Sequence, residues 1–182
     1  MTAQQIIHDH RTFRVILRGM SHPGKVYSLP GEPETGAIKL LGCLMDHEVS
    51  FAVLDNRDME TALALHTGSR PVSPEEADYI IVCDGTTSGI LADCRRGSLE
   101  YPDTGATIMY LVEELIEGDE GIVLSGPGVN GTISLQVKGL QTSEFRLLQK
   151  VNSEFPLGVD ALFLDRCGRI ACIPRSSRIG VN

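Results

Sequence analysis

The sequence predicts an α/β fold, a three-layer α/β/α sandwich built on a mixed or largely parallel sheet. Short and almost wholly apolar runs, of which residues 79–83 are the clearest, alternate with segments of helical period. Strands that are covered on both faces have such continuous apolar runs, so this alternation indicates helices on both sides of a sheet. A chain of 182 residues buries roughly 70% of its unfolded surface, enough for one core. We therefore expect residues 1–182 to form a single domain.

The first half of the chain alternates helices with short strands. Residues 4–19 have helical period, and this helix should end near residue 20 because proline at position 23 disfavours helix in the residue before it. The apolar side chains that share one face of it are Ile6, Phe13, Ile16, Leu17 and Met20. The next expected elements are a strand at 25–29, a helix capped by Thr35 and carrying apolar residues at 38–45, a strand at 50–54, a helix at 58–66 ending at Gly68, and a helical turn at 73–76.

The second half is richer in strands than a doubly wound fold requires. After the strand at 79–83, Thr86, Thr87 and Ser88 are expected to open a helix that runs through residue 95. The remaining expected elements are strands at 106–112, 121–124 and 131–137, a helix at 143–151, and a terminal pair of strands at 159–164 and 169–173.

The charge balance excludes some partners. Lys and Arg number 16 against 24 Asp and Glu, which gives a net charge of −8. Nucleic acid and an anionic membrane surface are therefore not expected as principal partners, because both require a positive footprint. Of the 16 basic residues, 12 are Arg, the side chain suited to bidentate recognition of carboxylate or phosphate.

Cysteine and histidine usage predicts a cytoplasmic protein without a metal site. The five cysteines show no CxxC spacing and no disulfide framework, and His8 and His10 point apart on the predicted helix. The N-terminus lacks the basic and apolar regions of a signal peptide, and no apolar run approaches the roughly 20 residues of a membrane span.

Three loops that follow predicted strands could carry a ligand, since ligands of open α/β sheets gather beyond the carboxyl ends of the strands. They are 55–56, 84–89 and 125–131. The second offers hydroxyl and backbone N–H groups for an anion, although capping and turn chemistry account for the same residues. The third leads into a strand, so a tight turn is its simpler interpretation. No nucleophile is recognisably linked to a base such as His22, and we assign no catalytic residue.

The arginines allow two interpretations. Arg11, Arg14 and Arg18 form one stripe along the first helix, which either faces solvent or docks an acidic partner or a phosphorylated ligand. Arg175 and Arg178 add positive charge near the C-terminus.

Seven segments, taken in order, resemble a known family, the PhnH subunit of the carbon–phosphorus lyase system for phosphonate breakdown. They are 13–14, 20–24, 54–55, 97–107, 124–128, 155–160 and 173–177. The sequence departs from the family at His22, where Arg is typical, and at Ser176 and Ser177, where Thr is commoner.

The resemblance implies a fold similar to the large domain of pyridoxal-phosphate-dependent transferases, but without that cofactor or any other. It implies a homodimer that joins PhnG, PhnI and PhnJ in a cytosolic core complex. With PhnL, that complex displaces adenine from ATP by a phosphonate, giving α-D-ribose 1-methylphosphonate 5-triphosphate from methylphosphonate. The chain would be an accessory subunit of this synthase, and a stand-alone enzyme or binding protein for a phosphorylated small molecule is the alternative.

The resemblance also selects residues. The candidates for a ligand site or an interface are Arg14, Arg18, Asp160 and Arg175. The residues expected to shape the motifs are Pro23, Gly24, Tyr101, Pro102, Gly105, Gly126, Gly128, Pro156 and Gly158.

Overall fold

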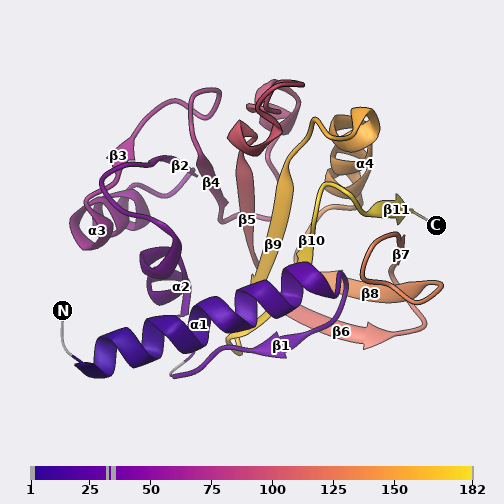
Figure 1. Ribbon diagram of the computed structural model, residues 1–182, viewed down its shortest axis with the longest axis horizontal. Helices are drawn as coiled ribbons and strands as arrows, with labels where there is room; N and C mark the ends of the chain where they lie inside the picture. The colour runs from indigo at the N-terminus through magenta and orange to yellow at the C-terminus, as the bar shows by residue number, and fades with distance from the viewer. Residues whose placement is uncertain (1–2, 32, 34–35, 182) are drawn as a thin grey trace.

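The computed structural model describes residues 3–31, 33 and 36–181. Its centre is a seven-stranded mixed sheet in the order β1-β10-β9-β5-β4-β2-β3 (Figure 1). The four pairings from β9 to β3 are parallel, whereas β10 and β1 are antiparallel to their neighbours. The strands are β1 (Tyr27–Ser28), β2 (Ser50–Leu54), β3 (Arg70–Pro71), β4 (Tyr79–Val82), β5 (Thr107–Val112), β9 (Asp160–Asp165) and β10 (Arg169–Ile173).

Three helices cover one face of this sheet: α1 (Ala3–Ser21), α2 (Gly36–Leu44) and α3 (Arg57–Thr67). Successive residues of a strand point to opposite faces, so Ile81 packs with this helical layer while Ile80 packs on the other side. The helices contribute Ile16, Leu40 and Leu63 to the core between them and the sheet.

The opposite face is covered by one helix and a second sheet. The helix is α4 (Thr142–Val151), and the four-stranded antiparallel sheet has the order β11-β7-β8-β6. Its strands are β6 (Glu114–Gly118), β7 (Ile122–Ser125), β8 (Ile133–Lys138) and β11 (Arg178–Gly180). Two short 3₁₀ turns that contact α4, η2 (Ile90–Asp93) and η4 (Asn152–Glu154), belong to this layer, and a third, η3 (Pro102–Thr104), lies in the loop before β5. The α/β class and the mixed sheet are thus confirmed, but half of the third layer is a sheet, which the predicted α/β/α sandwich did not include.

Most predicted elements are confirmed to within two or three residues, and Gly68 ends α3 in the left-handed conformation with φ 73°. The cap predicted at Thr35 lies outside the described residues. The helix predicted for 86–95 is wrong, since only η2 forms there. Gly85, Ser88 and Gly89 have positive φ angles of 70°, 51° and 92°, which a continuous right-handed helix cannot contain.

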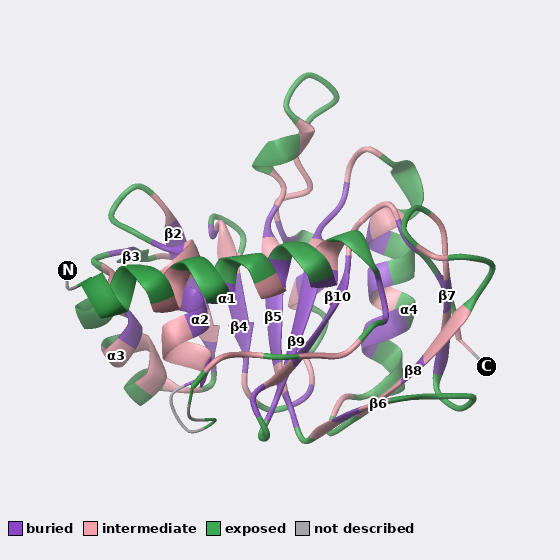
Figure 2. Ribbon diagram, turned by 60° about the horizontal axis from the view of Figure 1, so that its bottom comes forward, coloured by how far each residue is buried: buried purple, intermediate pink, exposed green. Residues whose placement is uncertain are grey.

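The apolar face of α1 is only partly buried. Ile16 is buried at 5% exposure, but Ile6, Phe13 and Leu17 are 54%, 42% and 49% exposed. The side of α1 that does pack inward is formed by Thr12, Ile16 and Gly19. Gly19 lets the helix approach β10, because a Cβ at this position would lie 2.7 Å from the Sγ of Cys172. The outer side of α1 is exposed along its length (Figure 2).

Within the described residues, no helix is both long and apolar enough to cross a membrane.

Candidate functional site

Arg175 and Asp160 form a mostly buried ion pair at the carboxyl end of β10. The Arg175 Nη2 lies 2.6 Å from Oδ2 of Asp160, its Nε 3.1 Å from the same oxygen, and its backbone N–H donates to Oδ1 at 2.8 Å. The two side chains are only 13% and 20% exposed. Such a forked, charge-assisted contact fixes the guanidinium plane, because arginine presents its donors in a rigid array.

The remaining donors of Arg175 fasten the loop that precedes β5. Nη1 donates to the carbonyl of Pro102, and Nη2 reaches the carbonyl of Gly105 at 3.5 Å. Gly105 has no room for a side chain, since a Cβ there would lie 2.4 Å from the Gly158 carbonyl oxygen and 2.6 Å from Nη1 of Arg175. Pro102 and Gly105, chosen as motif residues, therefore belong to the surroundings of one guanidinium.

The turn between α4 and β9 joins the same cluster. Its Gly158 has φ 147° and donates its N–H to the Arg96 carbonyl at 2.9 Å. Asn152 holds both backbone groups of Val159, at 2.8 and 3.0 Å, and Arg96 pairs with Glu154 at 3.0 Å. We name the set formed by 96–105, 152–160 and Arg175 the Arg175 cluster; it contains the cis peptide bond before Pro156.

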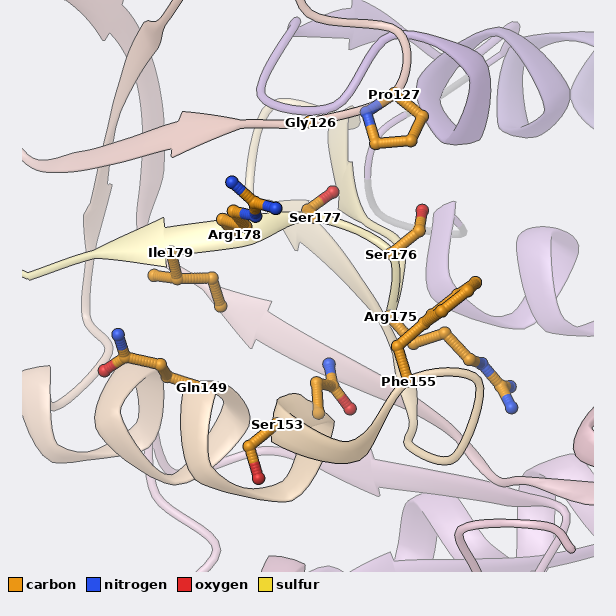
Figure 3. Close-up of a pocket in the computed structure, with 11 residues that line it drawn as sticks. Gly126, Pro127, Gln149, Ser153, Phe155, Arg175, Ser176, Ser177, Arg178 and Ile179 are labelled. Atoms are coloured by element: carbon orange, nitrogen blue, oxygen red, sulfur yellow. The ribbon is translucent and has the colours of Figure 1, made fainter. Parts of the chain in front are cut away.

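A hollow of about 810 Å³ opens beside this cluster (Figure 3). We call it the C-terminal hollow. Figure 3 shows β11 with Ser177 and Arg178 running between the loop of Gly126 and Pro127 and the helical turn that carries Ser153. A second hollow of about 440 Å³ adjoins it, since Phe155 and Arg175 line both.

The C-terminal hollow offers uncommitted polar groups. The Oγ of Ser177 is buried and has no hydrogen-bond partner among the described residues. Arg178 is exposed and forms no ion pair within the described part of the chain, unlike Arg175. A guanidinium with free donors at the edge of a hollow suits an anionic group such as a phosphate or a phosphonate.

Two further motifs meet next to the hollow. Gly128 has φ 81°, and a Cβ there would lie 2.1 Å from the carbonyl oxygen of Ser21 at the end of α1. Gly24 donates its N–H to the Cys172 carbonyl at 3.1 Å and, with the buried Pro23, packs under β7 and β8 through Leu124 and Ile133. These glycines allow the 125–131 loop to lie against the chain that leaves α1.

The four candidate residues for a ligand site or an interface divide between two places. Asp160 and Arg175 are bonded to each other, whereas Arg14 and Arg18 lie on the exposed side of α1 and line neither hollow. Gly126, with φ 122°, lines the hollow itself. Tyr101 is 63% exposed at the tip of its loop.

The loop predicted as an anion cradle holds an anion that belongs to the protein. The carboxylate of Glu144 is buried and accepts bonds from Thr86 Oγ1 at 3.0 Å, from Thr87 N at 2.9 Å and from Thr87 Oγ1 at 2.9 Å. Tyr110 donates its hydroxyl to the same carboxylate at 3.0 Å, and burial together with this negative charge raises the pKa of Tyr110. Glu144 could not be singled out from the sequence, because its position in the first turn of an amphipathic helix is common for an exposed acid.

The two buried thiols are poorly suited to act as nucleophiles. Burial raises the pKa of Cys94 and of Cys172 to about 12, which keeps both protonated at neutral pH. His22 shares a hydrogen bond with the Arg18 carbonyl at 3.1 Å. No group of three or more metal-binding side chains occurs among the residues the structure describes.

The fold and the site define an α/β protein in which a mixed sheet and a small antiparallel sheet share a core and the C-terminal motifs gather around one arginine. The chain belongs to the family of the bacterial phosphonate metabolism protein PhnH, whose model matches residues 2–180. The resemblance indicated by the ordered motifs is thereby confirmed.

Two relatives extend this comparison. HtxG of Stutzerimonas stutzeri, described as a candidate C-P lyase subunit, is 32% identical over 181 residues, covering 97% of this chain and 88% of its own. The PhnH subunit of the α-D-ribose 1-methylphosphonate 5-triphosphate synthase of Rhizobium meliloti (strain 1021) is 26% identical over 187 residues, covering 97% and 92%.

Proposed function

We propose that this chain is an accessory subunit of a bacterial carbon–phosphorus lyase system. In this role it takes part in the complex that makes α-D-ribose 1-methylphosphonate 5-triphosphate from ATP and methylphosphonate. The observation that carries the proposal is that motifs from three distant segments meet at the Arg175 cluster. The two relatives, which the chain matches over nearly their full length, are named as subunits of such a system.

The finer features of this proposal follow from the family. Residues 1–182 act as one domain, related to the large domain of pyridoxal-phosphate-dependent transferases but working without that cofactor. The chain forms a homodimer and assembles with PhnG, PhnI and PhnJ in the cytoplasm. The Arg175 cluster shapes a surface for this assembly, and no residue of it is assigned to catalysis.

Complementation tests the proposal. In a strain that lacks the gene for this chain and has methylphosphonate as its sole phosphorus source, the wild-type chain should restore growth and co-purify with PhnG, PhnI and PhnJ. Arg175→Lys should reduce both, because an ammonium cannot reproduce the forked contacts to Asp160, Pro102 and Gly105. Arg146→Lys, at an exposed position of α4, is the matched control.

The result that overturns the proposal is a well-folded wild-type chain that neither restores growth nor co-purifies. Circular dichroism of Arg175→Lys separates a loss of assembly from a loss of folding. If this variant is unfolded, Arg178→Ala replaces it, since Arg178 forms no ion pair in the described part of the chain.

A stand-alone ligand-binding protein is the second candidate, favoured by the uncommitted Arg178 and Ser177 of the C-terminal hollow. Calorimetry of the isolated chain with ATP and with methylphosphonate distinguishes the two. Micromolar binding that Arg178→Ala abolishes supports this candidate, and an absence of heat for both ligands rejects it.

A further inference from the structure

The outer face of α1 carries large apolar side chains that nothing in the described chain covers. Ile6, Phe13 and Leu17 are between 42% and 54% exposed, and Ile7 is 53% exposed. Apolar residues scattered singly on a surface need no explanation, but these follow one another at spacings of seven and four. In a helix that spacing places Ile6, Phe13 and Leu17 in one row, which is the pattern of a helix-packing seam.

A row of arginines runs beside this seam. Arg11, Arg14 and Arg18 are all exposed, and helical geometry turns them roughly 100° around the axis from the seam. In the described part of the chain none of the three is paired with a carboxylate. By contrast, Arg169 and Arg175 both have carboxylate partners within 2.7 Å. We call the seam and the arginine row together the α1 outer face (Figure 2).

This face has the opposite sign to the molecule that carries it. The net charge of the chain is −8, whereas Asp9 is the single acidic residue in α1 and lies on its half-buried side. An apolar seam flanked by unpaired guanidinium groups is complementary to an apolar seam flanked by carboxylates. Helices meet in this way when the flanking charges of one fit those of the other.

We infer that the α1 outer face docks an acidic amphipathic helix of another subunit of the complex. This inference rests on the proposed function, which requires the chain to commit surface to other subunits. The apolar side of the partner helix packs on Phe13 and Leu17, and its Asp and Glu residues pair with Arg14 and Arg18.

A second copy of the chain fits this face poorly. A two-fold axis that packs α1 antiparallel against its own copy brings each flank against the same flank of the other helix. The arginine rows would then face each other, and like charges across an interface oppose association. The remaining alternative is a parallel pairing of the two α1 helices, which would place the arginines of one copy against the opposite flank of the other. That flank is already covered by α2, whose Cys43 Sγ donates to the Asp9 carbonyl at 3.2 Å.

The test compares two double variants in complexes reconstituted with PhnG, PhnI and PhnJ. Arg14→Glu with Arg18→Glu reverses the row, and Phe13→Gln with Leu17→Gln removes the apolar seam. Each pair should weaken binding of the chain to the other subunits by about tenfold or more. Arg146→Glu on α4 is the matched control and should bind as the wild type does. Because all four substituted side chains are exposed, the melting temperatures should be unchanged.

Salt dependence adds a readout specific to charge. Wild-type binding should weaken as the sodium chloride concentration rises from about 50 mM, where charges are weakly screened, to about 300 mM, where they are strongly screened. Binding of an Arg14→Gln, Arg18→Gln variant should be weaker at low salt and should change less.

The outcomes separate the two proposals. A wild-type chain that fails to join the complex overturns the proposed function and this inference together. A wild-type chain that joins, with both double variants binding equally well, overturns the inference alone. The inference alone is also overturned if the variants assemble with the other subunits as the wild type does but lose binding to phosphatidylglycerol vesicles, or lose dimerisation measured by light scattering.

Discussion

Glu144 is the residue on which three elements depend. Its carboxylate accepts hydrogen bonds from Thr86 and Thr87 after β4 and from Tyr110 in β5, while its own helix α4 lies across them. Among the residues that the structure describes, no cation pairs with it, so the carboxylate is stabilised by neutral donors and by the N-terminal end of α4. A buried charge held in this way is costly to leave without its partners.

We predict that Glu144→Ala lowers the free energy of unfolding by about 3 kcal/mol, because it leaves buried donors unsatisfied and creates a cavity. Tyr110→Phe removes a single donor and should cost about 1 kcal/mol. Urea denaturation measures both. Equal effects of the two variants would show that Glu144 does not organise the other donors.

Asp78 makes the stability of the folded protein depend on pH in the acidic range. Partial burial raises the pKa of its carboxyl, but hydrogen bonds from Ser50 and the neighbouring guanidinium of Arg95 outweigh it and hold the pKa below the ordinary 3.8. The resulting stabilisation is complete above that ordinary value and is lost as the pH falls through the lower pKa of the folded state.

Asp78→Asn should therefore make the free energy of unfolding depend less on pH below 3.8. Between pH 5 and 7, roughly the range of maximal stability, the pH dependence should be the same as in the wild type. The pair with Arg95 is about one-third exposed, so the magnitude should be small. A series of urea titrations at stepped pH tests this. An unaltered slope below 3.8 in the variant would assign the acid sensitivity to other carboxyls.

Among the elements, α1 and the loop at 125–131 are coupled by close backbone contact. Gly128 and Gly131 both have positive φ, at 81° and 77°, but only Gly128 faces the chain leaving α1. The Cβ of an alanine at 131 would meet nothing within 4 Å. The pair thus separates the cost of backbone strain from the cost of a steric clash.

We predict that Gly131→Ala costs about 1 kcal/mol from strain alone, and that Gly128→Ala costs about 3 kcal/mol or more because the loop must also move away from Ser21. Thermal denaturation of the two variants measures the difference. If they are equally stable, the loop adjusts freely and does not fix the end of α1.

Local sequence patterns account for most elements but not for their partners. The strands at 50–54 and 79–82 and the helix at 142–151 carry apolar periods that any context would reveal. The helix predicted after β4 does not form because Glu144, 57 residues along the chain from Thr87, draws the loop into another conformation. The apolar row of α1 is largely exposed, which the sequence does not reveal because periodicity identifies an apolar side and not what covers it. The bonds between Arg175, Pro102 and Asp160 join residues far apart in sequence, and no spacing predicts them.

For the molecule as a whole, one apolar cluster joins the two sheets. It includes Ile108 and Phe163 of the large sheet together with Leu124, Leu135 and Ile179 of the small one. Tyr110 stacks on Phe163 inside this cluster at a centroid distance of 5.3 Å. A shared core of this kind favours a single cooperative unfolding transition.

Leu135→Ala tests this coupling, because Leu135 is fully buried in β8 of the small sheet. We expect a loss of about 3 kcal/mol that appears equally in tyrosine fluorescence, to which Tyr27, Tyr79 and Tyr110 of the large sheet contribute, and in far-ultraviolet circular dichroism. Two separate transitions in the variant would show that the small sheet unfolds independently.

The carboxylate of Glu144 also determines what the loop after β4 can accept from solution. The hydroxyls of Thr86 and Thr87 and the N–H of Thr87 already donate to Glu144, so the loop is an anion-binding site that a carboxylate of the same chain fills. Removing that side chain should leave a vacancy shaped for a small carboxylic acid, so that formate, and not chloride, restores thermal stability to Glu144→Ala in a saturable way. The hydroxyls and the backbone N–H that Glu144 occupies are accordingly unavailable to any phosphonate or nucleotide that this protein contacts.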